Sequence, residues 1–355
     1  MDRIPQSRTR FNEKDYTSMK SFLDGYNTGH IKSLEKSLGD FHGVKHVVAV
    51  SSGTSALYVL FQALNLSTED AVIVPSYTWP SAANAAALLG ARVIFADVDP
   101  DSYLVTPEIL DELLGKKRSD VRRMYVVQIH QFGLVEHLRP ISEICIKHDS
   151  ILLEDSAWSL GSDQPLSGIA GIWSFHPRKL ISGGEGGAVY TDNDELAEKC
   201  RIYRNHGYEQ HVGFSHKGLN LRLPEVQAVL INNQMERVVT LLQSRLDVAE
   251  YYFNALGDIP EIKLPVKSKE HLYQAFTVFL NGINKNDFIS KCDDSGVEIK
   301  SAGFCTHTHK AWSFEGHELL DVSLSLENSL ITLPTFEGIS ETQLKKVVET
   351  VKENL

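Results

Sequence analysis

The sequence predicts an α/β protein whose mostly parallel sheet is covered by helices on both faces. Short apolar runs in the first half predict strands at 46–50, 71–75, 92–97, 123–129 and 150–154. Helical patterns at 54–64, 81–89 and 138–148 lie between them. Helices of this length are the connections that neighbouring parallel strands require, and this is why we expect most of the sheet to be parallel.

A smaller α+β domain is expected after this sheet. Residues 224–256 read as one long helix, opened by Pro224, a residue suited to a first helical turn. A strand at 272–280, a helix at 286–296 and a last helix from about Glu341 follow. We therefore expect a large domain over residues 1–240 and a small domain over 241–355, with the N-terminal segment free to pack on the small domain.

Composition and charge narrow the functional classes. The 355 residues are 42% hydrophobic and 23% charged, as in ordinary globular proteins. The net charge of −11 lacks the basic footprint of a nucleic-acid-binding protein. No run of 18 apolar residues predicts a membrane span, and the charged N-terminus is unlike a signal peptide. Four widely spaced cysteines indicate reduced thiols in a cytoplasmic protein: Cys145, Cys200, Cys292 and Cys305.

Lys179 has an unusual sequence context. It lies between SFHP at 174–177 and the glycine-rich GGEGG at 183–187. A phosphate-binding P-loop lysine would follow its glycines and precede Ser or Thr, whereas here the glycines come later and Leu180 is next. The P-loop interpretation therefore fails on order. The remaining chemical use of a buried lysine is as a nucleophile that forms a Schiff base with a carbonyl.

Polar or flat side chains follow several of the expected strands, at the edge where open parallel sheets bind ligands. SSGTSAL at 51–57 opens a helix, so the amides of Thr54 and Ser55 would suit a phosphate, although a plain helix cap has the same pattern. Asp155 ends an apolar strand, where a carboxylate needs a cation, a helix end or another donor. Trp79 follows another strand and could stack on a flat ring or belong to the core.

Taken together, a lysine, a carboxylate, an aromatic face and a helix terminus are the groups that pyridoxal 5′-phosphate (PLP) requires. The chain resembles the DegT/StrS-type PLP-dependent sugar aminotransferases over nearly its full length. The resemblance implies the fold-type I aminotransferase architecture, in which a small C-terminal α+β domain follows the large one. Its motifs include VSSGTSAL (50–57), VPSYTWPSAANA (74–85), IHQFG (129–133), LLEDSA (152–157), SFHPRKLISGGEGGAV (174–189) and NLRLPEVQAVLINNQMER (220–237).

The resemblance assigns a chemical role to three residues. Lys179 would form the Schiff base with the cofactor and later move the proton between substrate and cofactor. Asp155 would keep the ring nitrogen protonated, so that the ring can accept electrons. Trp79 would stack on the ring.

The resemblance also implies how the phosphate is held. Thr54, Ser55 and the Ser174 hydroxyl would bind it. Asn220 is expected to reach the phosphate of the neighbouring subunit, which would make a homodimer with shared active sites the catalytic unit.

Trp158 departs from the family pattern. Family members usually carry Gln or His three residues after the aspartate, in contact with the ring hydroxyl, and here that position is Trp158. An indole donates one hydrogen bond and accepts none. We expect Trp158 to line the cofactor pocket and to donate to the ring hydroxyl directly or beside a water; packing in the core is the alternative.

A cysteine and several histidines near residue 305 could in principle bind a metal. In an extended strand, Cys305, His307 and His309 would point to one face, with His317 as a fourth ligand. The spacing matches no common zinc pattern, and the segment lies where the family has a substrate-side loop. We therefore expect no metal.

The resemblance implies a PLP-dependent transaminase with glutamate as the expected amino donor. The expected acceptor is a nucleotide-linked keto-deoxysugar for surface polysaccharide or secondary metabolite biosynthesis. A nucleotide-free keto-sugar or a carbocyclic ketone is the alternative, because the fold does not fix the substrate.

A related dehydratase branch replaces the lysine with histidine and is disfavoured because Lys179 is present. A non-catalytic PLP-sensing regulator would need a further module, and none is recognisable. We expect a cytoplasmic homodimer with small-molecule substrates and with neither nucleic-acid nor membrane partners.

Overall fold

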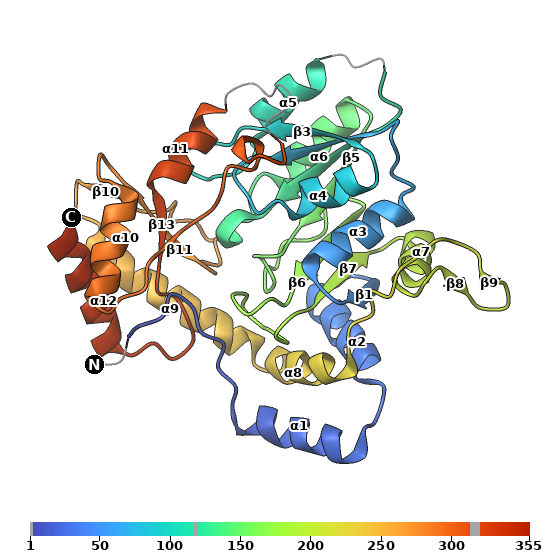
Figure 1. Cartoon of the computed structure of the whole chain (residues 1–355), viewed down its shortest axis with the longest axis horizontal. Helices are drawn as coiled ribbons and strands as arrows, with labels where there is room; N and C mark the ends of the chain where they lie inside the picture. Colours follow the sequence, from blue (N-terminus) through green and yellow to red (C-terminus); the bar gives the residue numbers. More distant parts are fainter. Residues whose placement is uncertain (1–2, 117–119, 313–319) are drawn as a thin grey trace.

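A seven-stranded sheet forms the centre of the larger part of the molecule in the computed structural model, which describes residues 3–116, 120–312 and 320–355 (Figure 1). The strand order is β1-β7-β6-β5-β4-β2-β3. β2 pairs in parallel with β3 and β4, and the parallel pairing continues through β5 to β6. β7 runs antiparallel to both its neighbours. The strands are β1 (His46–Val50), β2 (Ala71–Pro75), β3 (Arg92–Ala96), β4 (Met124–Ile129), β5 (Ser150–Asp155), β6 (Ala170–Ser174) and β7 (Gly187–Thr191).

Helices cover both faces of this sheet, as predicted. In β1, Val48 and Val50 enter one core cluster while Val47 and Ala49 enter another, because successive side chains of a strand point to opposite faces. The first face is covered by α3 (Gly53–Ala63), α4 (Ser81–Leu88) and α7 (Asp194–Arg204). The other is covered by α2 (His30–His42), α5 (Pro107–Gly115), α6 (Leu138–Lys147) and α8 (Glu225–Met235).

The expected long helix after Pro224 is in fact two helices. α8 ends at Met235, and α9 (Val238–Leu256) begins after Arg237, whose φ of −119° and ψ of 16° are not helical. The Arg237 guanidinium binds Glu337 (3.0 and 3.1 Å) and Asp15 (3.2 Å), so contacts with remote segments hold the break. Pro224 is the N-cap residue of α8 rather than part of its first turn.

The second half forms a four-stranded antiparallel sheet of order β10-β11-β13-β12. Phe276, Phe288 and Val347 pack with α9 in a core of its own, so the apolar faces of these helices and strands are buried together. The elements are β10 (Ile262–Lys263), β11 (Phe276–Leu280), β12 (Lys300–Ser301), β13 (Leu330–Leu333), α10 (Lys285–Asp294), α11 (Asp321–Ser329) and α12 (Glu341–Asn354).

The N-terminal segment crosses to this second part. Ile4 bridges Val297, and the Thr335 N–H donates to the Gln6 carbonyl (3.0 Å). The segment then leads into α1 (Glu13–Gly25), which packs on α8. We propose that the domains divide close to the α8–α9 break, into residues 1–240 and 241–355, with the first residues packed on the small domain.

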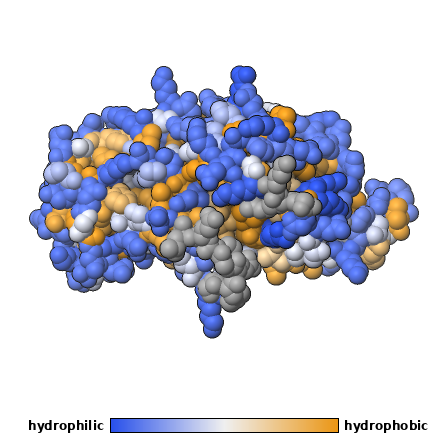
Figure 2. All heavy atoms as spheres, turned by 90° about the horizontal axis from the view of Figure 1, so that it is seen from above, coloured by the Kyte–Doolittle hydropathy of each residue, from blue (hydrophilic) through white to orange (hydrophobic). Residues whose placement is uncertain are grey.

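A two-stranded hairpin projects from the large part at the right of Figure 1. It is formed by β8 (Tyr208–Glu209) and β9 (Gly213–Phe214), and the side chains of Val212 and Phe214 are 66% and 77% exposed. Figure 2 shows apolar atoms beside polar ones at this projecting end. Within the described residues, no helix is long and apolar enough to cross a bilayer. The four cysteines are free and buried.

Candidate active site

Lys179 lies in the loop that joins β6 to β7. Its N–H donates to the His176 carbonyl (2.8 Å), and the Ser182 hydroxyl donates to the Phe175 carbonyl (3.0 Å), so the loop folds back on the end of β6. Gly186 has a φ of 143°, and a side chain there would lie 3.1 Å from the Phe175 ring. The later part of the glycine cluster is therefore needed for a close turn.

Lys179 and Asp155 share a desolvated environment. Burial lowers the pKa of Lys179 to about 7; the Asp155 carboxylate opposes this shift and Arg178 adds to it. Asp155 ends β5 and is 7% exposed. Burial raises the pKa of Asp155, against the opposing effects of the Ala157 N–H (3.0 Å) and of Lys179. The two pKa values are thus drawn toward each other, as is typical of sites that exchange protons with a substrate.

The N-terminus of α3 forms a polar cradle against β6. A side chain on Gly53 would lie 3.0 Å from Ser174 Cβ and 3.3 Å from its hydroxyl, so glycine is what allows this approach. The Gly53 and Thr54 amides are in the first turn, where no helix carbonyl is available to accept from them. These amides and the Ser174 hydroxyl suit a phosphate dianion.

The expectation that the Ser55 amide is free is wrong. Ser52 is the N-cap of α3, and its hydroxyl accepts from the Ser55 N–H (3.0 Å). The cap and the cradle are therefore both present, and the Ser55 amide belongs to the cap. The Ser55 hydroxyl lies at the same helix end, 2.9 Å from Ser52 Oγ and 3.0 Å from Ser51 Oγ. A role for Ser55 in binding phosphate rests on this hydroxyl.

Two tryptophans flank the lysine loop. Lys179 Nζ lies 3.3 Å from the centroid of the Trp158 ring, so the face of the indole, rather than its N–H edge, meets the amine. Trp79 follows β2 and is 57% exposed. The Arg178 guanidinium lies 6.0 Å from the centroid of the Trp79 ring, and the Phe304 ring lies 5.6 Å away. Trp79 therefore keeps an open surface beside the lysine loop, on which a flat ring could stack.

Asn220 lies at the rim of the cradle rather than inside it. It bridges Asn205 on the return from the hairpin, and the carbonyl of the next residue, Leu221, accepts from the Ser51 N–H (2.9 Å). Its side chain is exposed. Within the described residues, no hydrogen bond joins that side chain to the cradle of the same chain. Its role in the neighbouring subunit stays a prediction.

The second half supplies two residues that the sequence analysis did not single out. Gln274 accepts from the Leu180 N–H (3.2 Å) and donates to the Leu160 carbonyl (3.1 Å). Phe304 is brought to Trp79 because the Thr306 N–H donates to the Ser76 carbonyl (2.9 Å). The sequence placed a substrate-side loop near residue 305, and this indicated the region of Phe304. Nothing in the local sequence pattern indicates Gln274.

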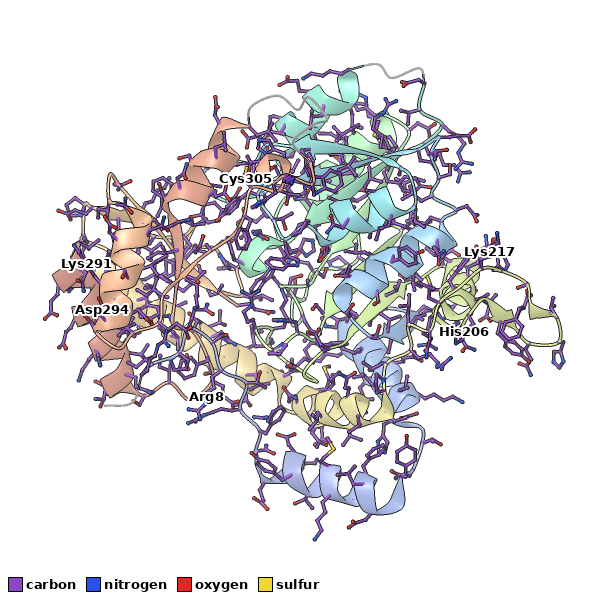
Figure 3. The ribbon with its side chains drawn as sticks, viewed as in Figure 1. Arg8, His206, Lys217, Lys291, Asp294 and Cys305 are labelled. Carbon is purple, nitrogen blue, oxygen red and sulfur yellow. The ribbon has the colours of Figure 1, made fainter. Side chains whose placement is uncertain are left out.

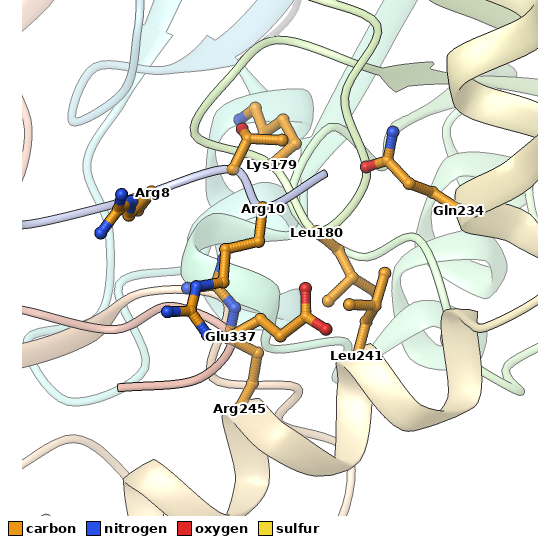
Figure 4. A pocket seen from close by; sticks show the side chains of 9 residues that line it. Arg8, Arg10, Lys179, Leu180, Gln234, Leu241, Arg245 and Glu337 are labelled. Carbon is orange, nitrogen blue, oxygen red and sulfur yellow. The ribbon is translucent and has the colours of Figure 1, made fainter. Parts of the chain in front are cut away.

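A small cationic pocket adjoins Lys179 (Figure 4). The N-terminal segment supplies Arg8 and Arg10, and α9 supplies Arg245, whose burial lowers its pKa to about 10. The Thr9 hydroxyl donates to the Pro177 carbonyl (2.8 Å), which holds the segment against the lysine loop. Arg8 is also seen in Figure 3, near the α8–α9 break. The N-terminal segment therefore contributes positive charge next to Lys179.

The cysteine and histidines near residue 305 do not share one face. Thr306–Thr308 form a 3₁₀ turn, so the extended alternation that we considered is wrong. Cys305 Sγ lies 3.2 Å from His307 Nδ1 in the interior, whereas His309 is exposed. Figure 3 marks Cys305 beside the large sheet, where it bridges Tyr77 just after β2. His317 lies outside the described residues, among which no group of three or more candidate ligands surrounds a metal position.

The chain is similar to known proteins over nearly its whole length. A GDP-perosamine synthase of Caulobacter vibrioides is 28% identical over an alignment of 367 positions, which covers 97% of this chain and 95% of that protein. A GDP-perosamine synthase of Vibrio cholerae is 25% identical over 338 residues, covering 91% and 90%. The solved structure of Helicobacter pylori PseC, an aminotransferase involved in the biosynthesis of pseudoaminic acid, has a TM-score of 0.93 at 21% identity and covers 99% of both chains; at that identity the likeness concerns the fold.

The family assignment covers almost the whole chain. The model of the DegT/DnrJ/EryC1/StrS aminotransferase family matches residues 13–352, which include every site residue described above except Arg8, Thr9 and Arg10. The fold-type I architecture predicted from the motifs is confirmed. The chain belongs to the DegT/DnrJ/EryC1/StrS aminotransferase family and is a PLP-dependent transaminase.

Proposed function

We propose that this transaminase moves an amino group from glutamate to the ketone of a nucleotide-linked keto-deoxysugar. The observation that carries the transamination chemistry is the desolvated pair of Lys179, with a pKa of about 7, and Asp155. The sugar class is supported by the two relatives that are named GDP-perosamine synthases. GDP-linked keto-deoxysugars are therefore the first substrates to test.

The residues present fit PLP. A phosphate needs amides and hydroxyls at a helix end, and the approach of Gly53 to Ser174 leaves no room for a side chain at that point. A protonated ring nitrogen needs a buried carboxylate, which Asp155 supplies. The aldehyde needs a weakly basic amine, which Lys179 supplies. Trp79 offers the flat surface.

The roles of the side chains follow from these positions. When bound, PLP supplies an aldehyde carbon that takes up the amino group and a ring that accepts electrons. Because burial lowers the pKa of Lys179 to about 7, both the neutral and the protonated amine are accessible near neutral pH, and Lys179 can both remove and return a proton. Asp155 keeps a positive charge on the ring nitrogen, and the α3 cradle fixes the phosphate end.

The active unit is a homodimer in which Asn220 completes the partner's phosphate site. Its exposed side chain at the rim of the cradle supports this arrangement. The projecting hairpin exposes Val212 and Phe214, apolar side chains that a second subunit would cover. The enzyme works in the cytoplasm, where its four buried thiols stay reduced.

The two halves of the reaction can be tested separately. Purified enzyme loaded with PLP and mixed with glutamate should lose the visible absorption of the lysine-bound cofactor and release 2-oxoglutarate. Adding a nucleotide-linked keto-deoxysugar, GDP-linked first, should restore the absorption and give an amino-sugar nucleotide detectable by mass spectrometry. Failure with glutamate would contradict the donor. Success with glutamate but turnover only of nucleotide-free ketones would contradict the acceptor.

A further inference from the structure

The amine of Lys179 contacts the face of the Trp158 indole. Nζ lies 3.3 Å from the centroid of the indole ring. Among the described residues, no hydrogen bond or ion pair reaches this nitrogen, so the Asp155 charge acts on it from beyond ion-pair distance. A cation over an indole face is attracted by the negative face of the ring. The face of Trp158 can therefore hold the protonated amine of Lys179 by cation–π attraction.

Gln274 ties together the two loops that carry this pair. Its side-chain carbonyl accepts from the N–H of Leu180, the residue after Lys179 (3.2 Å). Its amide donates to the carbonyl of Leu160, two residues after Trp158 (3.1 Å). Gln274 is only 2% exposed, so both bonds form away from water, where an unpaired polar group would be costly. The Gln274 side chain thus links the loop that carries Lys179 to the loop that carries Trp158.

Trp158 also packs beside a strained turn. Phe132 has a φ of 57°, which is uncommon for a residue with a side chain, and its ring lies 6.1 Å from the Trp158 ring. A side chain on Gly133 would lie 3.0 Å from the Trp158 carbonyl, so the turn also requires glycine there. Strain of this kind persists where the surroundings enforce it, often at functional sites.

We propose that Trp158 and Gln274 are positioning residues for Lys179: the indole face holds the amine, and the Gln274 amide fixes the distance between the loops. This inference rests on the proposed function only in taking Lys179 as the reacting amine. It differs from the expected hydrogen bond of the indole N–H to the cofactor, which concerns the edge of the ring and stays a prediction.

The ring face would act against the other influences on Lys179. Desolvation lowers the pKa of the amine, and the indole face, by stabilising the ammonium form, raises it. The charged and titratable groups that face the amine or its loop are Asp155, His176, Arg178, Glu185, Arg8, Arg10, Arg245 and Glu337. Glu337 is already bound by Arg237 at 3.0 and 3.1 Å. After desolvation, the Asp155 carboxylate favours the ammonium form of Lys179 and Arg178 favours the neutral amine. The indole face therefore keeps an ammonium available for returning a proton.

The first test measures the pKa of Lys179 itself. Full-length enzyme saturated with pyridoxamine 5′-phosphate, in which the lysine is free, is labelled with trace acetic anhydride across a pH series, and labelling of the Lys179 peptide is read by mass spectrometry. Trp158→Leu should lower the pKa of Lys179 by about 0.5 to 1, and Trp158→Phe, which keeps an aromatic face, should lower it less. Trp312→Leu removes another buried tryptophan, in the large core, and should leave it unchanged.

The second test asks whether the two residues act through the same lysine. Gln274→Met keeps the volume but removes both hydrogen bonds, and should reduce kcat about tenfold with little change in KM for glutamate. Gln128→Met, at a buried glutamine that donates to the Val105 carbonyl, is the matched control and should keep kcat. In a double-mutant cycle, Trp158→Leu should reduce kcat less in the Gln274→Met background than in the wild type.

Two outcomes would overturn the proposal. One is a Lys179 pKa that is unchanged or higher in Trp158→Leu while the variant stays folded in a thermal melt. The other is strictly additive effects in the cycle. Neither outcome bears on the proposed function, because turnover of glutamate by the wild type is measured independently. Conversely, if the wild type failed with glutamate, the measured pKa of Lys179 would still test the role of Trp158.

Discussion

Gly53 and Ser174 meet where the first helix after β1 faces the end of β6. A side chain on Gly53 would lie 3.0 Å from Ser174 Cβ and 3.3 Å from its hydroxyl. The contact joins two segments that are far apart in the chain and leaves the Gly53 and Thr54 amides at the same point as the Ser174 hydroxyl. The cradle at the N-terminus of α3 therefore requires glycine at position 53, because even the methyl group of alanine would crowd Ser174.

Gly53→Ala should weaken PLP binding at least about tenfold, because the new methyl group pushes the helix end away from Ser174. Fluorescence titration of the apoenzyme with PLP measures the affinity. Gly115→Ala is the matched control: it also lies at a helix end, and a side chain there meets nothing within 4 Å. Equal affinities in both variants and the wild type would argue against the cradle.

Asp155→Ala should reduce kcat by on the order of 10³-fold, since the ring loses the charge that keeps its nitrogen protonated. Steady-state kinetics with glutamate and the sugar substrate measure this. The same change should lower the pKa of Lys179, because the Asp155 carboxylate raises it in the wild type. A variant with near wild-type kcat would contradict the ring-nitrogen role.

Lys179 should also make the stability of the apoenzyme depend on pH. Its folded pKa of about 7 is below the ordinary value of 10.5, so the unfolded chain binds more protons between these values and stability rises with pH across that window. As the pH falls toward 7, this stability is lost.

Urea unfolding at a series of pH values checks this dependence. Lys179→Met should reduce the slope and stabilise the apoenzyme at pH 7 by about 1 to 3 kcal/mol, since part of the gain is offset by the lost attraction to Asp155. Lys32→Met, at an exposed lysine, should change neither. A Lys179→Met variant with the full wild-type slope would show that the amine is hydrated.

Asn220 should act across the subunit interface. Mixing inactive Lys179→Ala subunits with inactive Asn220→Ala subunits should restore activity, because one site of each mixed dimer then carries both changes and the other carries neither. Subunit exchange is verified by native mass spectrometry. If exchange occurs and activity does not return, both residues serve the site of a single chain.

Local apolar patterns predicted β1 to β5, but neither β6 nor β7. The connections between β1 and β5 contain helices, whose amphipathic periods are visible in the sequence. The connection from β5 to β6 has no helix, although these two strands are parallel, and the chain returns from β6 to the antiparallel β7 through the lysine loop. Neither connection therefore carries the helical pattern that separated the earlier strands.

The α8–α9 break and Gln274 were beyond the reach of sequence reasoning for a related reason. The apolar period runs through residue 237 without interruption, and the break is held by pairing of Arg237 with Glu337 and Asp15, residues that are distant in the sequence. Gln274 lies 94 residues from Leu180 and 114 from Leu160, its two partners. Asp155 and Trp79 could be found because they follow the ends of predicted strands, and Lys179 because of its position before a glycine cluster.

The most direct test of the central claim is the absorption spectrum of Lys179→Ala reconstituted with PLP. Without the amine no covalent link to the cofactor can form, and the proton carrier is lost. We expect a folded protein that lacks the visible band of the lysine-bound cofactor and forms no 2-oxoglutarate from glutamate at a catalytic rate. A Lys179→Ala protein that keeps both the band and wild-type turnover would contradict the account.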